Sequence, residues 1–487
     1  MNEPSATEPQ SGPQSAPATD VSQQRIESDS MGQIAVPAQH YWGAQTARAL
    51  VHFAIGRERM PLPLYHAFGI VKRAAAEVNV ARGALGHQQA MAIIQAANEV
   101  ASGALDAEFP LAVWQTGSGT QSNMNVNEVI ANRAIQLLGG VLGSKDPVHP
   151  NDHVNLAQSS NDTMPTAMHV ATALAILRQV RPAADSLAAT IENKANFWMA
   201  VVKIGRTHLQ DAVPLTVGQE WSGWAAQLRG AIAQLDYCLP ALLELAAGGT
   251  AVGTGLNAPR GFSRAIAARI AALTGIEFVT APNKFAALGG LDAMVAASAA
   301  LRQVAVVLYK IANDLRWLAS GPRAGIGELR LPENEPGSSI MPGKVNPTQC
   351  EAIIMIATQI IGLDSAVAFA GAQGNFELNV MRPLVIYNVL TTAQLLADGM
   401  VSFRDYTVAG TKLNKTRIND GLEQSLMLVT ALSPTLGYDK AAELAHHAHQ
   451  QGLSLRAAAL QSGLISEAQF DALVNPLAMV GDGVAGA

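Results

Sequence analysis

The segment LDAMVAASAALRQVAVVLYKIANDLRWL, residues 291–318, decides the fold class of this chain. Its small and apolar residues recur at alternating spacings of three and four, the pattern of a helix in a bundle. A second stripe of the same kind begins after Thr216 and Gln219, which together predict a capping box. Strand-like patterns are few, so we expect a mainly α fold built around a long central helical bundle. The stripes consist of Leu291, Met294, Ser298, Leu301, Ala305, Leu308, Ala312 and Leu315, and of Val217, Trp221, Trp224, Leu228, Ile232 and Leu235.

Composition and charge narrow the class of protein. Among 487 residues, 32 Lys and Arg stand against 38 Asp and Glu, giving a net charge of −6. Charged residues are only 14% of the chain, against roughly 25% in an average soluble protein, which predicts extensive surface buried between long helices or between subunits. The acidic balance argues against a nucleic-acid partner. Cys238 and Cys350 cannot form a disulfide framework, so we expect a reducing, cytoplasmic location.

The chain divides into four parts by composition. Residues 1–30 are rich in Pro, Ser and Gln and fit neither a secretory signal nor a transit peptide, so a disordered tail is predicted. Residues 31–160 predict an N-terminal mixed, mostly helical domain, 161–410 the central long-helix bundle and 411–487 a small C-terminal helical domain. The most apolar stretch, Ala352 to Gly371, contains polar interruptions and predicts a buried helix rather than a membrane span.

Two polar segments in the N-terminal half suit the binding of an anion. Residues 116–128 offer many neutral donors, with a plain surface loop as the alternative; no strand precedes their Gly-x-Gly, which disfavours a dinucleotide site. Farther on, Pro165 predicts the first turn of a helix, so that Ser159, Ser160 and Asn161 lie at its N-terminus. Residues 149–155 contain two histidines four residues apart, which is typical of a metal pair, but Pro150 disrupts helical spacing and polar loop contacts are favoured.

Two further polar segments carry candidates for proton transfer. His208 lies in a polar turn that we expect between two long helices, where an imidazole suits acid–base work, although a lone histidine is more often structural. Lys344 precedes a predicted helix start at Asn346 and Pro347, and this pairing of a cation with a helix N-terminus suits a carboxylate. A Schiff base on Lys344 is the weaker alternative, because no apolar pocket is evident. Glu351, one turn in, can pair with a histidine.

Two glycine-rich segments and three histidines near the C-terminus lie outside these polar segments. The glycines at 321, 325, 327 and 337 predict a long mobile loop before the helix that contains Glu351. The Gly-rich run at 248–255 lacks a Walker ending, so helix connection or backbone packing near the site is favoured over a phosphate cradle. His446, His447 and His449 are expected on one helix face.

Residues 337–347, GSSIMPGKVNP, match without a gap the signature GSSxMPxKxNP of the fumarase/aspartase superfamily. The resemblance runs from about residue 25 to residue 480. It implies a three-domain, largely helical fold and a homotetramer with a twenty-helix core. It further implies active sites shared by three subunits and chemistry without metal, flavin or nicotinamide.

Within the superfamily, the details resemble the class II fumarate hydratases. The evidence is the segment TGSGTQSNMNVN at 116–127, together with His153, His208, Gly343 and the run Thr348 to Glu351. The resemblance implies reversible, stereospecific addition of water to fumarate, giving (S)-malate in the tricarboxylic acid cycle. Ser338 then transfers the C3 proton, and His208 with Glu351 activates the water, through an aci-carboxylate intermediate.

The resemblance also assigns binding residues. Those implied for the substrate are Ser118, Gly119, Thr120, Ser159, Ser160, Asn161, Thr207, Ser339, Lys344, Val345 and Asn346. A second dicarboxylate site is implied for His149, Pro150, Asn151 and Asp152. Leu156 and Ala157 depart from the polar pair expected there, often Lys-Ser, which affects the tuning of that second site.

Two other functions remain open. An aspartate ammonia-lyase shares the superfamily signature, and an assay that compares malate with aspartate as substrates separates the two activities. A non-catalytic structural relative would keep the scaffold alone; the intact Ser338, His208, Lys344 and Glu351 argue against it.

Overall fold

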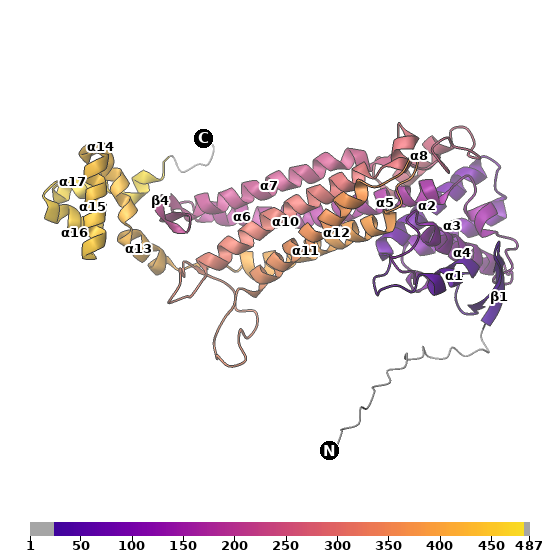
Figure 1. Ribbon diagram of the computed structural model, residues 1–487, viewed down its shortest axis with the longest axis horizontal. Helices are drawn as coiled ribbons and strands as arrows, with labels where there is room; N and C mark the ends of the chain where they lie inside the picture. Colours follow the sequence, from indigo (N-terminus) through magenta and orange to yellow (C-terminus); the bar gives the residue numbers. More distant parts are fainter. Residues whose placement is uncertain (1–23, 482–487) are drawn as a thin grey trace, which may run out of the picture.

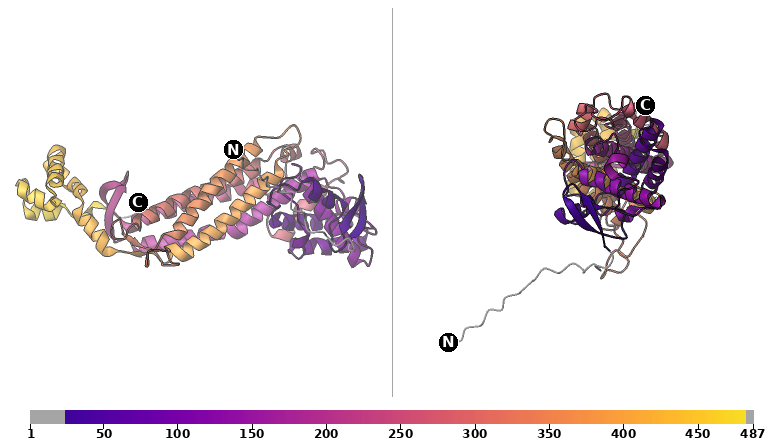
Figure 2. Two further views of the ribbon diagram at one scale, coloured as in Figure 1. Left: turned by 60° about the horizontal axis from the view of Figure 1, so that its bottom comes forward. Right: turned by 90° about the vertical axis from the view of Figure 1, so that its right-hand side faces the viewer.

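Long helices run side by side through the middle of an elongated molecule, with smaller folded parts at either end (Figures 1 and 2). The computed structural model describes residues 24–481 of the chain. The mainly α prediction is confirmed, since the described strands form only two-stranded sheets. The central bundle comprises α5 (Ser160–Ala175), α6 (Arg181–Phe197), α7 (Val217–Leu242), α10 (Asp292–Leu318), α11 (Thr348–Gly371) and α12 (Arg382–Phe403).

Both apolar stripes predicted from the sequence face the core of this bundle. In α7 the buried residues include Trp221, Leu228 and Leu235, and in α10 they include Leu301 and Leu308. The predicted capping box is confirmed: the Gln219 backbone N–H donates to Thr216 Oγ1 at 3.0 Å, and the Thr216 N–H donates to Gln219 Oε1 at 2.8 Å. These bonds satisfy two N–H groups that a helix start otherwise leaves unpaired.

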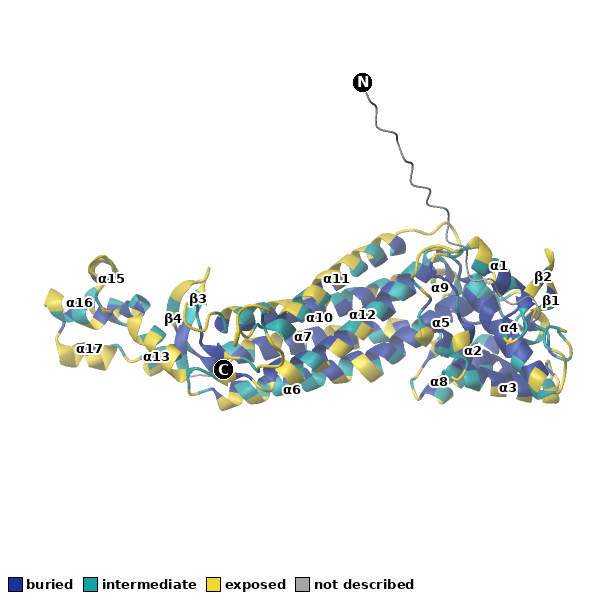
Figure 3. Cartoon of the chain, turned by 90° about the horizontal axis from the view of Figure 1, so that it is seen from below, coloured by how far each residue is buried: buried dark blue, intermediate teal, exposed yellow. Residues whose placement is uncertain are grey.

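Helix α11 differs from its prediction as a buried helix. Only one stripe of it packs within the chain, and much of its length is exposed (Figure 3). Met355 is 67% exposed and Phe369 is 76% exposed. By length and composition alone, Asp292–Leu318, Thr348–Gly371 and Arg382–Val408 could each cross a membrane. An apolar composition does not distinguish a helix covered by its own chain from one covered by another molecule, and this explains the error.

Polar contacts inside the bundle also bear on α11. Asp364 in the middle of this helix accepts hydrogen bonds from Ser298 Oγ and Arg302 Nε of α10, both at 2.6 Å. A carboxylate paired in this way orients α11 against α10 and fixes which of its faces remains outside. That outer face carries the exposed apolar side chains of Met355, Ile361 and Phe369.

The N-terminal part holds the helices α1 (Ala44–His52), α2 (Leu62–Ala81), α3 (His87–Ala101) and α4 (Thr120–Leu137). It begins with an antiparallel hairpin of β1 (Gln24–Asp29) and β2 (Gly32–Pro37). The predicted tail over 1–30 therefore extends too far, because residues 24–29 form β1; residues 1–23 lie outside the described part. The sequence signal was missed because the alternation in β1 is short.

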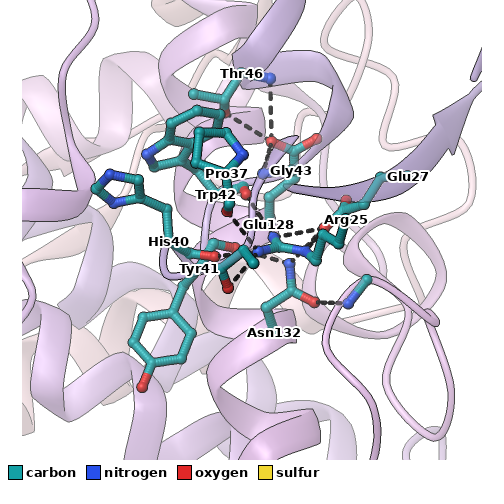
Figure 4. A network of polar contacts seen from close by, with 12 residues as sticks. Arg25, Glu27, Pro37, His40, Tyr41, Trp42, Gly43, Thr46, Glu128 and Asn132 are labelled. Atoms are coloured by element: carbon teal, nitrogen blue, oxygen red, sulfur yellow. Dashed lines mark hydrogen bonds and ion pairs between the residues drawn. The ribbon is translucent and has the colours of Figure 1, made fainter. Parts of the chain in front are cut away.

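Buried polar groups fasten this hairpin to the helices (Figure 4). The Arg25 guanidinium donates to the carbonyl oxygens of His40 at 2.6 Å and Trp42 at 2.9 Å. The Glu128 carboxylate of α4 accepts from the backbone N–H groups of Gly43 and Thr46 at the start of α1. A carboxylate at a helix N-terminus is favourable both as a cap and toward the helix dipole.

The C-terminal helices have a core of their own, which includes Leu432, Leu444 and Phe470. They are α13 (Lys415–Gln424), α14 (Ser433–Leu436), α15 (Tyr438–Gln451), α16 (Leu455–Ser462) and α17 (Glu467–Leu473). The three histidines at 446, 447 and 449 lie on α15, as predicted. The remaining short elements are β3 (Val202–Thr207), β4 (Gln210–Thr216), β5 (Glu244–Leu245), α8 (Phe262–Thr274), β6 (Val279–Thr280), α9 (Lys284–Gly289), β7 (Leu329–Arg330) and β8 (Lys412–Leu413).

Candidate active site

The segment at 116–128 is a loop only as far as Gly119, and it continues as α4. Gly119 adopts φ +77° as the residue before the helix, and the Ser118 and Thr120 hydroxyl oxygens lie 2.8 Å apart. A Cβ atom on Gly117 would lie 1.5 Å from the Val380 carbonyl oxygen, so only glycine fits there. The alternative of a plain surface loop is wrong, because α12 and its preceding residues press against this turn.

Helix α5 begins at Ser160, and Ser159 is its cap. The Asn161 N–H donates to Ser159 Oγ at 3.2 Å, and the Ser159 N–H donates to Asp162 Oδ1 at 2.9 Å. This confirms the predicted helix N-terminus. Pro165 lies beyond the first turn, inside the helix, and not in the first turn as predicted. The small hydroxyl and amide side chains at 159–161 therefore surround the positive end of a helix, where an anion is stabilised.

A buried lysine stands behind this helix start. Lys72 of α2 is 0% exposed, and its Nζ donates to Asn155 Oδ1 and Gln158 Oε1, each at 3.0 Å. Asn123 Nδ2 donates in turn to Asn155 Oδ1 at 3.2 Å and to Ser160 Oγ at 3.1 Å. Burial lowers the pKa of Lys72 to about 7, although the nearby Asp162 carboxylate acts in the opposite direction. Sequence reasoning missed Lys72 because a single lysine in an apolar helix carries no motif.

The Gly-rich run at 248–255 packs against the same helix start. Asp162 Oδ2 accepts the backbone N–H groups of Gly248 and Thr250 at 2.8 and 2.9 Å. Those N–H groups are therefore engaged by a carboxylate, and the prediction of backbone packing near the site is confirmed. Burial raises the pKa of Asp162, opposed by these hydrogen bonds. The buried Arg382 guanidinium donates to the Asn161 carbonyl oxygen at 2.8 Å, which further fixes this turn.

The segment assigned to the second dicarboxylate site forms a π-helix over Pro150–Val154. The Asn151 and Asp152 N–H groups donate to His149 Nδ1, and the His149 N–H donates to His153 Nδ1 at 2.8 Å. Both Nδ1 atoms are thus acceptors in local contacts. Burial lowers the pKa of His149, against the opposing effect of the Asp152 carboxylate. No group of three His, Cys, Asp or Glu side chains that could hold a metal is found within residues 24–481.

A cavity of about 430 Å³ connects this π-helix with the start of α5. Asn151, Asp152 and Ser159 all line it, and so do Leu156 and Ala157. Ala157 adopts φ +63°, a left-handed conformation that is uncommon for alanine. The unusual Leu156-Ala157 pair therefore lies on the wall between the two predicted binding segments.

His208 lies between the two long helices α6 and α7, as predicted, but the connection is a β-hairpin and His208 lies in its turn. β3 and β4 pair antiparallel with Thr207 opposite Gln210, and the two turn residues, His208 and Leu209, have φ of +57° and +63°. Two consecutive positive φ angles fit a type I′ turn, which usually contains Asn or Gly. The absence of those residues explains why this hairpin was not predicted. The turn projects the His208 imidazole into solvent.

The signature loop folds back on itself around Ser338. Its Oγ accepts the backbone N–H groups of Ile340 at 3.2 Å and Met341 at 3.0 Å. The Gly337 N–H donates to the Lys344 carbonyl oxygen at 3.0 Å, and a Cβ atom on Gly337 would lie 2.2 Å from that oxygen. Two N–H donors aimed at one hydroxyl oxygen favour negative charge on it. The helix after the loop starts at Thr348, with Pro347 as the preceding residue, slightly later than predicted.

The beginning of the predicted mobile loop is anchored. Glu328 is 4% exposed, and it forms ion pairs with Lys203 of β3 at 2.8 Å and with Arg206 at 2.7 Å. Immediately after it, β7 pairs with β8. The glycine content therefore overstated the mobility of this segment, because a buried acid and two cations hold its first half.

The predicted site residues gather at opposite ends of the bundle (Figure 1). One group, with Ser118, Ser159 and the second site, lies around the start of α5. The other group lies around the β3–β4 hairpin and the signature loop and consists of Thr207, His208, Ser338, Ser339, Lys344, Val345, Asn346 and Glu351. Helix α7 connects the two ends, and its 26 residues span about 39 Å at the usual rise per residue. One chain alone does not bring the groups together, and the described residues show no hydrogen bond or ion pair between His208 and Glu351.

Comparisons with known proteins agree with this architecture. The family described as "Lyase" matches residues 32–362, and that described as "Fumarase C C-terminus" matches residues 428–481. The fumarate hydratase class II of Methanosarcina acetivorans is 61% identical over 94% of this chain and 95% of its own length. That of Thermosynechococcus vestitus is 57% identical over 94% and 98%.

A solved structure shows the same fold. The crystal structure of a class II fumarase from Schistosoma mansoni superposes with a TM-score of 0.92 at 44% identity, covering 94% of this chain and 99% of its own. The predicted mainly helical, fumarase-like fold is therefore confirmed. Because sequence families and structure agree over nearly the whole length, the chain belongs to the class II fumarate hydratase family of lyases.

Proposed function

We propose that the chain catalyses the reversible, stereospecific hydration of fumarate to (S)-malate, the reaction of the tricarboxylic acid cycle, in the cytoplasm and without metal or organic cofactor. The observation that carries this proposal is the match, over 94% of the chain, to relatives named fumarate hydratase class II at 57–61% identity. The geometry at both ends of the bundle supports it, because each end offers groups suited to a dicarboxylate.

The end at α5 binds one part of the substrate. Ser159, Ser160 and Asn161 surround a helix N-terminus, and the Ser118 and Thr120 hydroxyl groups lie on a neighbouring turn. Lys72 adds a buried cation behind these neutral donors. Hydroxyl, amide and backbone N–H donors of this kind hold a carboxylate without neutralising it completely. Gly119 permits the close approach of the two turns.

The signature loop performs the proton transfer at carbon. In the direction from malate, the Ser338 oxygen takes the proton from C3, and the electron pair of that C–H bond moves into the adjacent carboxylate. The N–H groups of Ile340 and Met341 stabilise the serine oxygen in its anionic form. Lys344, Ser339, Val345 and Asn346 lie in the same loop, where the ammonium group and neutral donors stabilise the aci-carboxylate intermediate.

The hairpin completes the reaction. His208 protonates the hydroxyl group that leaves C2, with Glu351 as its partner, and releases water; in the hydration direction the same imidazole activates that water. Thr207 lies beside His208 on the exposed hairpin and is placed to meet a carboxylate. His149, Pro150, Asn151 and Asp152 form the second dicarboxylate site, next to the cavity that reaches Ser159.

Because the two groups lie near opposite ends of α7, a helix of 26 residues that is about 39 Å long, we propose a homotetramer whose twenty central helices bring groups from three subunits together. The exposed apolar face of α11 supports this assembly, since Met355 and Phe369 would otherwise remain in water. A face of this kind is typical of an obligate interface between subunits.

A mixing experiment tests both the reaction and the shared site. Purified chain is first assayed by the absorbance of fumarate, with malate or aspartate as substrate; malate alone should react, and activity with aspartate alone would indicate an ammonia-lyase. Two variants are then made, Asn161→Ala from the group at the start of α5 and Ser338→Ala from the group at the other end of the bundle. Both proteins, each expected to be strongly impaired, are dissociated, mixed and reassociated. Mixed tetramers contain some sites with both wild-type groups, so activity should return. If the wild type converts malate but mixing the variants restores no activity, the proposed reaction is supported and the proposed sharing of sites between subunits is wrong. A wild-type chain that is inactive with both malate and aspartate would favour the non-catalytic structural relative.

A further inference from the structure

We propose that the junction between the bundle and the C-terminal helices holds a binding site for a compact polyanion, formed by Lys194, Arg330, Lys412 and Lys415. A cavity of about 460 Å³ opens there, between the end of α6, the β7–β8 pair and the start of α13. All four cations line it, and none of its lining residues is acidic.

The four cations differ from their neighbours in having no acidic partner. Within the described part of the chain, none of them lies within ion-pair distance of a carboxylate, whereas the nearby Lys203 and Arg206 both pair with Glu328. The chain as a whole carries more acidic than basic residues. An all-basic cavity in an acidic protein is therefore a local feature that the composition does not explain.

The register of the small sheet brings two of these charges directly opposite each other. Arg330 of β7 pairs with Lys412 of β8 in the antiparallel register. Like charges directly opposite across a strand pair are destabilising. A bound anion between the two side chains converts this repulsion into attraction.

Lys194 and Lys415 are also placed unfavourably for an unoccupied surface. Lys194 is half-buried; its Nζ donates to the Thr411 carbonyl oxygen at 2.8 Å and lies 4.9 Å from the centre of the Trp198 ring. Despite these favourable contacts, burial and then the Lys412 charge lower its pKa. Lys415 is the first residue of α13, at the positive end of that helix, where a cation is disfavoured. Asn414 precedes the helix without a side-chain cap, which leaves the first-turn N–H groups for another acceptor.

One bound anion would reduce three separate unfavourable electrostatic effects. These are the repulsion between Arg330 and Lys412, the burial of the Lys194 charge, and the cation Lys415 at the uncapped start of α13. Four cations around about 460 Å³ suit a molecule with three or more negative charges, such as a chain of phosphates or a tricarboxylate. The site is separate from the two groups that bind substrate.

Titration calorimetry on the full-length protein tests this site with inorganic tripolyphosphate and with citrate at low ionic strength. We expect one polyanion to bind per chain, and the tighter of the two identifies phosphate or carboxylate as the preferred chemistry. The double variant Lys412→Gln/Lys415→Gln should bind at least about tenfold more weakly, as expected for the loss of two charged hydrogen bonds. Saturating fumarate should leave the affinity unchanged.

A matched double variant, Arg264→Gln/Lys440→Gln, removes the same charge from two exposed positions and should bind like the wild type. The proposal would be overturned by any of three results: an equal loss of polyanion affinity in both double variants, no binding of either polyanion to the wild type, or competition between polyanion and fumarate. Without polyanion, Lys412→Gln/Lys415→Gln should unfold at no lower a temperature than the wild type, because it loses repulsion. A clear loss of stability would mean that the cations serve the fold and not a ligand.

Discussion

Lys203 and Glu328 form a buried ion pair at 2.8 Å, with side chains 2% and 5% exposed. Lys203 belongs to β3 of the hairpin that presents His208, and Glu328 lies at the start of the segment that leads to Ser338. The same carboxylate also pairs with Arg206, two residues before His208. One acid therefore fixes the two segments proposed to exchange protons with the substrate.

Removing this acid should weaken both the fold and the turnover. In Glu328→Gln, Lys203 and Arg206 lose a charged partner, and breaking a buried pair costs roughly 3–5 kcal/mol in other proteins. Glu220 remains beside Lys203 and should limit the loss to the lower end of this range. Thermal unfolding and the turnover number measure the effect. Glu333→Gln, at an exposed position five residues along, is the control; equal behaviour of the two variants would contradict the anchoring role.

Lys72 should make stability depend on pH in a specific window. Its pKa is lowered by burial from 10.5 to about 7, so the unfolded chain binds more protons than the folded chain between these values. The unfavourable effect of burying Lys72 is complete below pH 7 and disappears as the pH rises toward 10.5. Relative to Lys72→Met, the wild type should therefore gain stability as pH rises, by up to about 1.4 kcal/mol per pH unit.

Denaturation of the two proteins between pH 6 and pH 10 measures this difference, and an exposed Lys440→Met substitution serves as the control. A second readout is the KM for fumarate. Because Lys72 is linked through Asn155 and Asn123 to Ser160, its loss should raise KM more than it lowers kcat. A pH-independent difference in stability, together with an unchanged KM, would show that Lys72 is neutral packing only.

Ser338 should matter to turnover far more than to binding. Ser338→Ala removes the proposed base but leaves the α5 donors untouched, so kcat should fall by about 100-fold or more, while the affinity for a dicarboxylate inhibitor changes little. Steady-state kinetics and equilibrium binding separate the two effects. Parallel losses in both quantities would indicate that Ser338 binds the substrate and does not transfer the proton.

The outer face of α11 should control assembly. Met355→Glu introduces a charge where we expect another subunit to cover an apolar side chain, and an unpaired charge in such an interface is strongly unfavourable. Light scattering should show that Met355→Glu has a lower molecular mass than the wild-type tetramer, and its activity should be lower as well. Val141→Glu, at a loop position that is also exposed, should stay assembled. An active tetramer of Met355→Glu would exclude α11 from the interface.

Helical periodicity predicted the bundle well, since α7 and α10 bury the stripes read from the sequence and α7 starts at its predicted capping box. The signature residues of the loop at 337–347 and the helix start at 159–161 were also found from local chemistry. The boundaries proposed at 160 and 410, and the catalytic roles, stay predictions.

What escaped sequence reasoning depends on distant partners. Lys72 and Glu328 are single charges within ordinary helical or glycine-rich contexts, and only the fold reveals that they are buried beside acceptors or cations. The His208 hairpin lacks the Asn or Gly that usually indicates such a turn. The exposure of α11 was missed because periodicity measures how apolar a face is, and not which molecule covers it.

The 26-residue length of α7 has an evolutionary consequence. This helix sets the spacing between the hairpin and the start of α5. Inserting or deleting one helical turn in α7 would therefore move one group of site residues relative to the groups on neighbouring chains, unless the other long helices of the bundle changed length as well. We therefore expect insertions and deletions in related sequences to occur mainly in loops and at the chain termini, while the central helices keep the same length.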